Sequence, residues 1–79
     1  MASAFVLITT KFGMAEEVAS KLMKMQNIKK IDTVEGEYDI IAEVDAKNEI
    51  KLENIMHENI KRLKNVEIVS PLMLKNNYS

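Results

Sequence analysis

Three carboxylates and a glycine lie close together near the middle of the 79-residue sequence, at Glu35, Gly36, Glu37 and Asp39. Gly36 is one of only two glycines and permits the positive φ of a turn between strands. In one interpretation, backbone amides near Gly36 meet the carboxylate of a small ligand and Asp39 meets its ammonium group, a charge-assisted pair suited to a zwitterion. In the other, Asp39 accepts hydrogen bonds from neighbouring amides and serves only the turn. The residues alone leave both interpretations open.

Other residue types that could support chemistry are sparse. The single histidine, His57, has no nearby nucleophile or orienting group, so we expect no catalytic residue and no enzyme. The chain has no cysteine, which excludes disulfides and thiolate metal sites, and we expect neither a metal nor a cofactor. The methionines fall at helical spacing and are better explained as gap-filling residues of a core or interface.

Composition argues against nucleic acid and membrane as direct partners. Eleven basic and twelve acidic residues leave a formal net charge of -1, which gives no electrostatic footprint for either. No apolar run approaches the roughly 18 residues that a membrane span requires. The apolar start of the chain lacks the preceding basic residue of a signal peptide. We therefore expect a soluble, cytoplasmic protein.

Hydrophobic periodicity predicts six elements around the turn. Strands are expected over residues 4–10, 28–34, 38–44 and 66–74, and helices over 15–26 and about 48–65. In the first strand, Phe5 and Leu7 point to one side and Val6 and Ile8 to the other. The expected inward stripe of the second helix is Leu52, Ile55, Met56, Asn59, Ile60 and Leu63.

Two single residues mark the ends and edges of these elements. Asn48 is a suitable N-cap for the second helix, because its side chain can accept a backbone N–H. Pro71 cannot donate to a strand ladder, so it indicates an edge position or a bulge in the last strand.

The two halves of the chain repeat with an offset of 38 residues, which aligns Leu22 with Ile60. A β-α-β unit used twice predicts an α+β, ferredoxin-like fold, in which a four-stranded antiparallel sheet carries both helices on one face. We expect residues 1–79 to form a single domain, small enough for oligomerisation to help stabilise it. Because the first strand is apolar on both sides, the second sheet face is expected to pair with another copy in a dimeric α/β barrel.

Several stretches resemble the effector-sensing domain of the Lrp/AsnC (feast/famine) regulators, namely residues 4–8, 22–25, 36–40 and 61–67. The resemblance covers about residues 4–74 and does not include a helix-turn-helix domain, so the chain resembles a stand-alone RAM module. It implies dimers paired through their sheets, assembly into tetramers or octamers, and small effectors, usually amino acids, bound between dimers.

The resemblance also implies which residues bind the effector. The Gly-x-x-Asp turn of the family matches Gly36–Asp39. The last strand of the family commonly has alternating threonines that hold the effector, and the matching stretch 69–71 departs from this pattern. The expected ligand-binding residues are Gly36, Glu37, Tyr38, Asp39, Val69, Ser70 and Pro71.

From these expectations we predict a homo-oligomeric module that binds an amino acid and acts on transcription indirectly, by assembling with full-length Lrp/AsnC regulators. One alternative is a small ferredoxin-like dimeric enzyme, which would need a base such as His57 in a cavity between helices and sheet. The other is a purely structural assembly partner without a ligand, which the departure at residues 69–71 favours.

Overall fold

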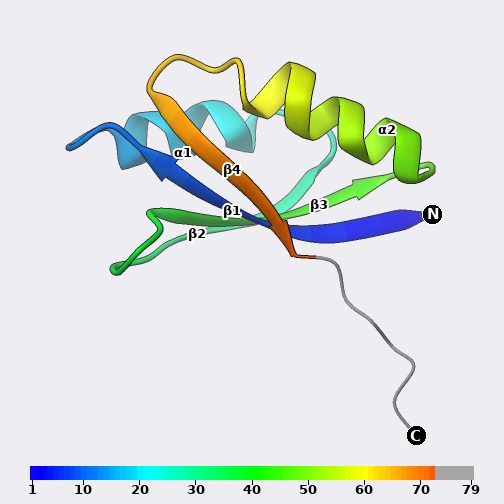
Figure 1. Ribbon diagram of the computed structural model, residues 1–79, viewed down its shortest axis with the longest axis horizontal. Coiled ribbons are helices and arrows are strands. Elements are labelled where there is room, and N and C mark those ends of the chain that lie inside the picture. Colours follow the sequence, from blue (N-terminus) through cyan, green and yellow to red (C-terminus); the bar gives the residue numbers. More distant parts are fainter. Residues whose placement is uncertain (73–79) are drawn as a thin grey trace, which may run out of the picture.

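The elements follow one another as β-α-β-β-α-β in the computed structural model, which describes residues 1–72. The strands are β1 (Ala2–Thr10), β2 (Ile28–Thr33), β3 (Ile40–Ala46) and β4 (Val66–Leu72), and the helical segments are α1 (Ala15–Met23), α2 (Glu49–Asn54) and η1 (Ile55–Ile60). All helical segments lie on the same side of the sheet (Figure 1). The predicted ferredoxin-like fold is confirmed, and residues 73–74 of the last predicted strand lie outside the described residues.

The sheet has four antiparallel strands in the order β2-β3-β1-β4. Ile8 of β1 lies opposite Ile40 on one side and opposite Val69 on the other. Pro71 lies on the edge strand β4, opposite Val6. An edge strand pairs on one side only, so the missing N–H of proline is tolerated there. The predicted edge position of Pro71 is confirmed, whereas β3 begins two residues later than predicted, at Ile40.

The hydrophobic core lies between the sheet and the helices. Its largest fully buried side chains are Ile8, Leu22, Ile40, Leu52, Ile60, Val6, Val18 and Val44. Burying a side chain of this kind stabilises the fold by about 1.5–3 kcal/mol. Leu22 and Ile60, which are equivalent in the sequence repeat, both have an exposed fraction of 0%. Each half of the repeat therefore supplies one helix with a central core residue.

The helix ends show why the predicted bounds differ from the observed ones. The N–H groups of Lys24 and Met25 donate to carbonyl oxygens three residues earlier. Such bonds tighten the last turn, so α1 ends at Met23 rather than at residue 26. At the start of α2, Asn48 Oδ1 accepts the backbone N–H of Lys51 at 2.8 Å. The predicted N-cap is therefore confirmed.

The second helix changes from α to π geometry at Ile55. The N–H of Lys61 donates to the carbonyl oxygen of Met56, five residues earlier, at 2.9 Å. Ile55, Met56 and Ile60 are buried as expected. Asn59 is exposed, so its predicted inward position is wrong. An amide in the apolar core without a partner would be costly, and at the surface Asn59 stays solvated.

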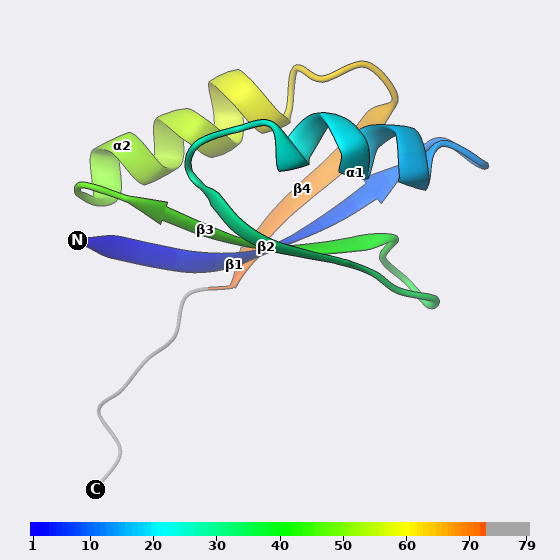
Figure 2. The same cartoon turned by 180° about the vertical axis from the view of Figure 1, so that it is seen from behind.

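The sheet face opposite the helices, called the open face here, carries apolar side chains from three strands. They are Phe5 and Leu7 of β1, Ile41 of β3, and Ile68 and Leu72 of β4. The exposed fractions of Phe5, Ile68 and Leu72 are 38%, 54% and 53%. No helix of residues 1–72 lies on this side (Figure 2). A single copy therefore exposes an apolar surface that soluble monomers rarely expose over a large area.

Candidate functional site

One backbone hydrogen bond closes the turn between β2 and β3. The N–H of Val34 donates to the carbonyl oxygen of Asp39 at 2.9 Å. Within this turn Gly36 has a φ of 139°, which residues with a Cβ rarely adopt. A Cβ added to Gly36 would meet no atom within 4 Å, so conformation rather than crowding accounts for the glycine. Gly36 and Glu37 are exposed and Tyr38 is half-buried, which leaves the turn open to solvent.

Asp39 connects this turn to the central strand β1. Its N–H donates to the carbonyl oxygen of Ile8 at 2.9 Å. Its carboxylate Oδ2 accepts the backbone N–H of Thr10 at 2.8 Å, and the Thr10 hydroxyl lies 3.5 Å from the same oxygen. Oδ1 accepts no hydrogen bond from residues 1–72. The structural interpretation therefore accounts for one carboxylate oxygen and leaves the other available.

The predicted residues of the last strand lie across β1 from the turn. Val69 lies opposite Ile8, which in turn lies opposite the first residue of β3. Ser70 lies opposite Leu7 on the open face, whereas Val69 and Pro71 face the helices. From Val69 onward, β4 runs away from the turn. In a single chain, β1 thus separates the two halves of the predicted site.

The remaining candidates for chemistry stay apart from one another. His57 is exposed on η1. Within residues 1–72, histidines and carboxylates do not gather in groups of three or more that could hold a metal ion. Met56 is buried in the core and Met25 packs against the core, as predicted for gap-filling residues. Met23 is 65% exposed and fills no gap in the core, and Met73 lies outside the described residues. None of the helices in residues 1–72 has the length and apolar character to span a membrane.

A second polar cluster lies around Asp45, at the end of β3 far from the turn. Ser3 Oγ donates to Asp45 Oδ1 at 2.7 Å, and Lys29 Nζ lies 3.1 Å from Asp45 Oδ2. The hydrogen bond from Ser3, followed by the interaction with Lys29, holds the pKa of Asp45 below its ordinary value of 3.8. Asn27 exchanges two hydrogen bonds with the Asp45 backbone, both 2.9 Å long. Sequence reasoning missed this cluster because its members are 16 to 42 positions apart, as in the pairs Lys29–Asp45 and Ser3–Asp45.

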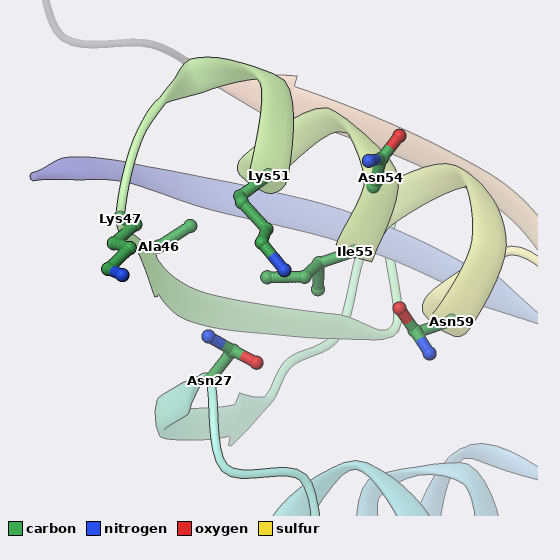
Figure 3. A pocket seen from close by; sticks show the side chains of 7 residues that line it. All are labelled: Asn27, Ala46, Lys47, Lys51, Asn54, Ile55 and Asn59. Carbon is green, nitrogen blue, oxygen red and sulfur yellow. The ribbon is translucent and has the colours of Figure 1, made fainter.

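A cavity of about 360 Å³, called the Lys51 pocket here, lies beside this cluster. It is lined by Asn27, Ala46, Lys47, Lys51, Asn54, Ile55 and Asn59. Figure 3 shows the ammonium group of Lys51 extending from α2 toward Asn27, with Asn59 contributed by η1. The sequence offers no signal for this pocket, because it forms where three separate segments meet. In addition, the helical pattern placed one of its residues, Asn59, on the side of the helix that faces the core.

The chain is similar to known proteins along nearly its whole length. A sequence profile of the Lrp/AsnC ligand binding domain matches residues 3–77. The chain belongs to the Lrp/AsnC family. One relative is the HTH-type transcriptional regulator FL11 of Pyrococcus furiosus, which is 40% identical over 53 residues. The match covers 67% of this chain and 35% of FL11, so the chain matches about a third of the length of that regulator.

Solved structures show the same Lrp/AsnC fold. The crystal structure of FFRP-DM1 has a TM-score of 0.90 and 31% identity, covering 95% of this chain and 100% of that chain. The transcriptional regulator NMB0573 of Neisseria meningitidis, solved as a complex with L-Met, has a TM-score of 0.83 and 14% identity, covering 99% of this chain and 52% of that chain. The second likeness shows the fold alone. The chain thus carries the ligand-binding domain of a family of transcription regulators.

Proposed function

We propose that this protein binds a small amino acid at the Gly36–Asp39 turn and that binding changes its state of assembly. The observation that carries the proposal is the hydrogen bonding of Asp39. Its Oδ2 is fixed by the N–H of Thr10 at 2.8 Å, and its Oδ1 has no hydrogen bond within residues 1–72. A carboxylate held by one oxygen is pre-organised to accept an ammonium group with the other. Partial burial strengthens such a pair relative to a fully exposed one.

The backbone of the turn supplies donors for the carboxylate of the ligand. Within residues 1–72, the N–H groups of Gly36, Glu37 and Tyr38 make no backbone hydrogen bond. Gly36 lacks a side chain, so a ligand can approach the backbone closely. The exposed carboxylates of Glu35 and Glu37 add negative charge to the same turn. The site therefore favours amino acids with uncharged side chains over Asp and Glu as ligands.

The last strand is proposed to contribute the apolar part of the same site. Ser70 offers a hydroxyl on the open face, whereas Val69 and Pro71 offer apolar side chains on the helix side of β4. Apolar side chains suit an apolar ligand side chain better than a polar one. Because β1 separates these residues from the turn within one chain, we assign the complete site to the junction of several copies. A regulator with this fold has been solved as a complex with L-Met, so the fold accommodates an amino acid.

The open face is the proposed interface of the dimer from which larger assemblies form. Phe5 and Ile68 expose 38% and 54% of their surface in a single chain. Pairing of two copies would bury both side chains and stabilise the dimer by about 25 cal/mol for each Å² of apolar area buried. Dimers would then associate into a larger ring such as an octamer. An effector held between dimers stabilises only the assembled state and so shifts the equilibrium toward it.

An indirect action on transcription follows from the family. FL11, with which this chain shares 53 aligned residues, is an HTH-type transcriptional regulator. The net charge of -1 gives this chain little attraction for a phosphate backbone. We therefore propose that it co-assembles with full-length Lrp/AsnC regulators through the RAM-type surfaces. Effector binding to the mixed assembly would then alter the DNA-binding partner.

Thermal melting together with light-scattering mass tests the sensor proposal. The protein is measured alone and with each of the twenty amino acids in turn. We expect a selective rise in melting temperature with an uncharged amino acid, which disappears in Asp39→Asn. The control is Asp32→Asn, because Asp32 is an exposed carboxylate of β2 that lies 3.9 Å from Lys30. An unchanged melting temperature and an unchanged mass with every amino acid would contradict the proposal.

A second candidate is a structural assembly partner that binds no effector. The hydrogen bond from Thr10 explains the carboxylate of Asp39 without any ligand, and this observation favours the second candidate. It predicts assembly that is independent of amino acids. An enzymatic role has less support, because His57 is exposed on η1 and the relatives of the chain are transcription regulators.

A further inference from the structure

The Lys51 pocket has a composition suited to an anion. Among the residues that line it are two lysines, Lys47 and Lys51, and three asparagines, and none is acidic. The pocket is lined by residues at the end of β3 and in α2. The Gly36–Asp39 turn leads into β3 at the other end of that strand (Figure 2). Within one chain the pocket is therefore separate from the Gly36–Asp39 turn of the proposed amino-acid site.

The two lysines carry positive charge that no neighbouring carboxylate neutralises. Within residues 1–72, neither Lys47 nor Lys51 forms an ion pair. The nearby carboxylate of Asp45 is already bound by Ser3 at 2.7 Å and by Lys29 at 3.1 Å. Two like charges beside one cavity repel each other, and an anion bound between them would convert this repulsion into attraction.

Hydrogen bonds fix the walls of the pocket in advance. The side chain of Asn48 accepts the N–H of Lys51 at 2.8 Å, which fixes the start of α2. Asn27 donates its Nδ2 to the carbonyl oxygen of Asp45 at 2.9 Å. Its Oδ1 is therefore left as an acceptor, suited to a hydroxyl group of a ligand. Pre-organised groups of this kind lower the cost of ordering on binding.

We propose that the Lys51 pocket binds a small phosphorylated polyol. The phosphate group, with a charge of about -2 near neutral pH, matches the two unpaired ammonium groups, and Lys binds phosphate as a point charge. The polyol hydroxyls match the asparagine amides, which both donate and accept. A volume of about 360 Å³ lies within the roughly 300–1,000 Å³ of small-molecule pockets. This second ligand goes beyond the proposed sensing of amino acids.

Two-dimensional ¹⁵N–¹H NMR tests the proposal with three probes at constant ionic strength: inorganic phosphate, glycerol 3-phosphate and glycerol. We expect both phosphates to shift the side-chain amide signals of Asn27, Asn54 and Asn59 saturably, with glycerol 3-phosphate bound more tightly. Glycerol alone should cause no shift at the same concentration. Shifts spread over lysines throughout the surface, or no shifts at the three amides, would overturn the proposal.

Matched lysine variants locate the binding. Lys51→Met keeps an unbranched side chain with good helix propensity, and loss of one charge-assisted contact should raise the Kd for glycerol 3-phosphate about tenfold. Lys61→Met is the control, because Lys61 is an exposed lysine that follows η1 and does not line the pocket. An equal rise of the Kd in both variants would indicate non-specific attraction to lysines and contradict the proposed site. Asp39→Asn should bind the phosphate normally, so the two proposed sites can fail independently.

Discussion

The backbone N–H of Thr10 donates a hydrogen bond to Oδ2 of Asp39 at 2.8 Å, across 29 positions of sequence. This contact ties the turn before β3 to the end of β1. It gives Asp39 a structural role in the free protein, while Oδ1 stays free for a ligand within the described residues. Substitutions that remove the charge, or the whole acceptor, can therefore distinguish the two roles.

Removing the acceptor should cost stability. Thr10 is buried, with an exposed fraction of 8%, so Asp39→Ala leaves its N–H without a partner and should lower the free energy of unfolding by about 1–3 kcal/mol. Asp39→Asn keeps an oxygen in the same place and should lose less than about 1 kcal/mol. Urea unfolding of both variants measures the difference. Equal losses would show that the hydrogen bond does not stabilise the fold.

Thr9 presents the reverse case. Its hydroxyl is buried and has no hydrogen-bond partner within residues 1–72. Thr9→Val replaces the hydroxyl with a methyl group of similar size and should stabilise the protein by up to about 1 kcal/mol. Thermal melting measures the change, with Thr10→Val as the control, because the Thr10 hydroxyl donates to the carbonyl oxygen of Lys11 at 3.2 Å. A lower melting temperature in Thr9→Val would show that another copy supplies the missing partner.

A charge on the open face should break the proposed dimer. Ile68→Lys places an ammonium group among the apolar side chains of that face and should lower the mass measured by light scattering, because an unpaired charge is costly in an apolar interface. Ile50→Lys is the matched control, since Ile50 is 73% exposed on α2, in the opposite layer. The interface lies elsewhere if both variants keep the mass of the wild type.

The Asp45 cluster should make stability depend on acidic pH. The pKa of Asp45 is lowered in the folded protein from its ordinary value of 3.8. Its ionised form therefore adds stability that is complete above that ordinary value and is lost as the pH falls through the folded pKa. Ser3→Ala should therefore lower the melting temperature at neutral pH and have a smaller effect once the pH falls below the lowered pKa of Asp45. Ser20→Ala, at an exposed position of α1, is the control. An effect of Ser3→Ala that does not change with pH would contradict this account.

The main outlines of the fold can be predicted from the sequence, because side chains that face the core recur with a regular spacing along each strand and each helix. The alternation of Phe5 and Leu7 with Val6 and Ile8 predicts two apolar faces of β1, and the structure adds that Val6 and Ile8 face the helices. Helical spacing likewise predicts the inward positions of Leu52 and Ile60 in the second helix. These predictions need only the geometry of one strand or one helix.

The site could be predicted only in part, because its contacts depend on how elements meet. The turn at Gly36 has a local signal, but the bond between Asp39 and Thr10 requires the register of β1 and β3. The pocket around Lys51 depends in addition on the exposed position of Asn59 in the π-helical segment η1. Residue types and spacing alone do not fix such relationships.

Isothermal titration of the amino acid that most raises the melting temperature tests the central claim most directly. Binding to the wild type and to Asp32→Asn should be the same, whereas Asp39→Asn should bind at least about tenfold more weakly, because a charge-assisted hydrogen bond to the ligand is lost. The light-scattering mass should rise with ligand occupancy in the first two proteins only. Equal affinity in Asp39→Asn, or binding without any change in mass, would contradict the account of this turn as an effector site coupled to assembly.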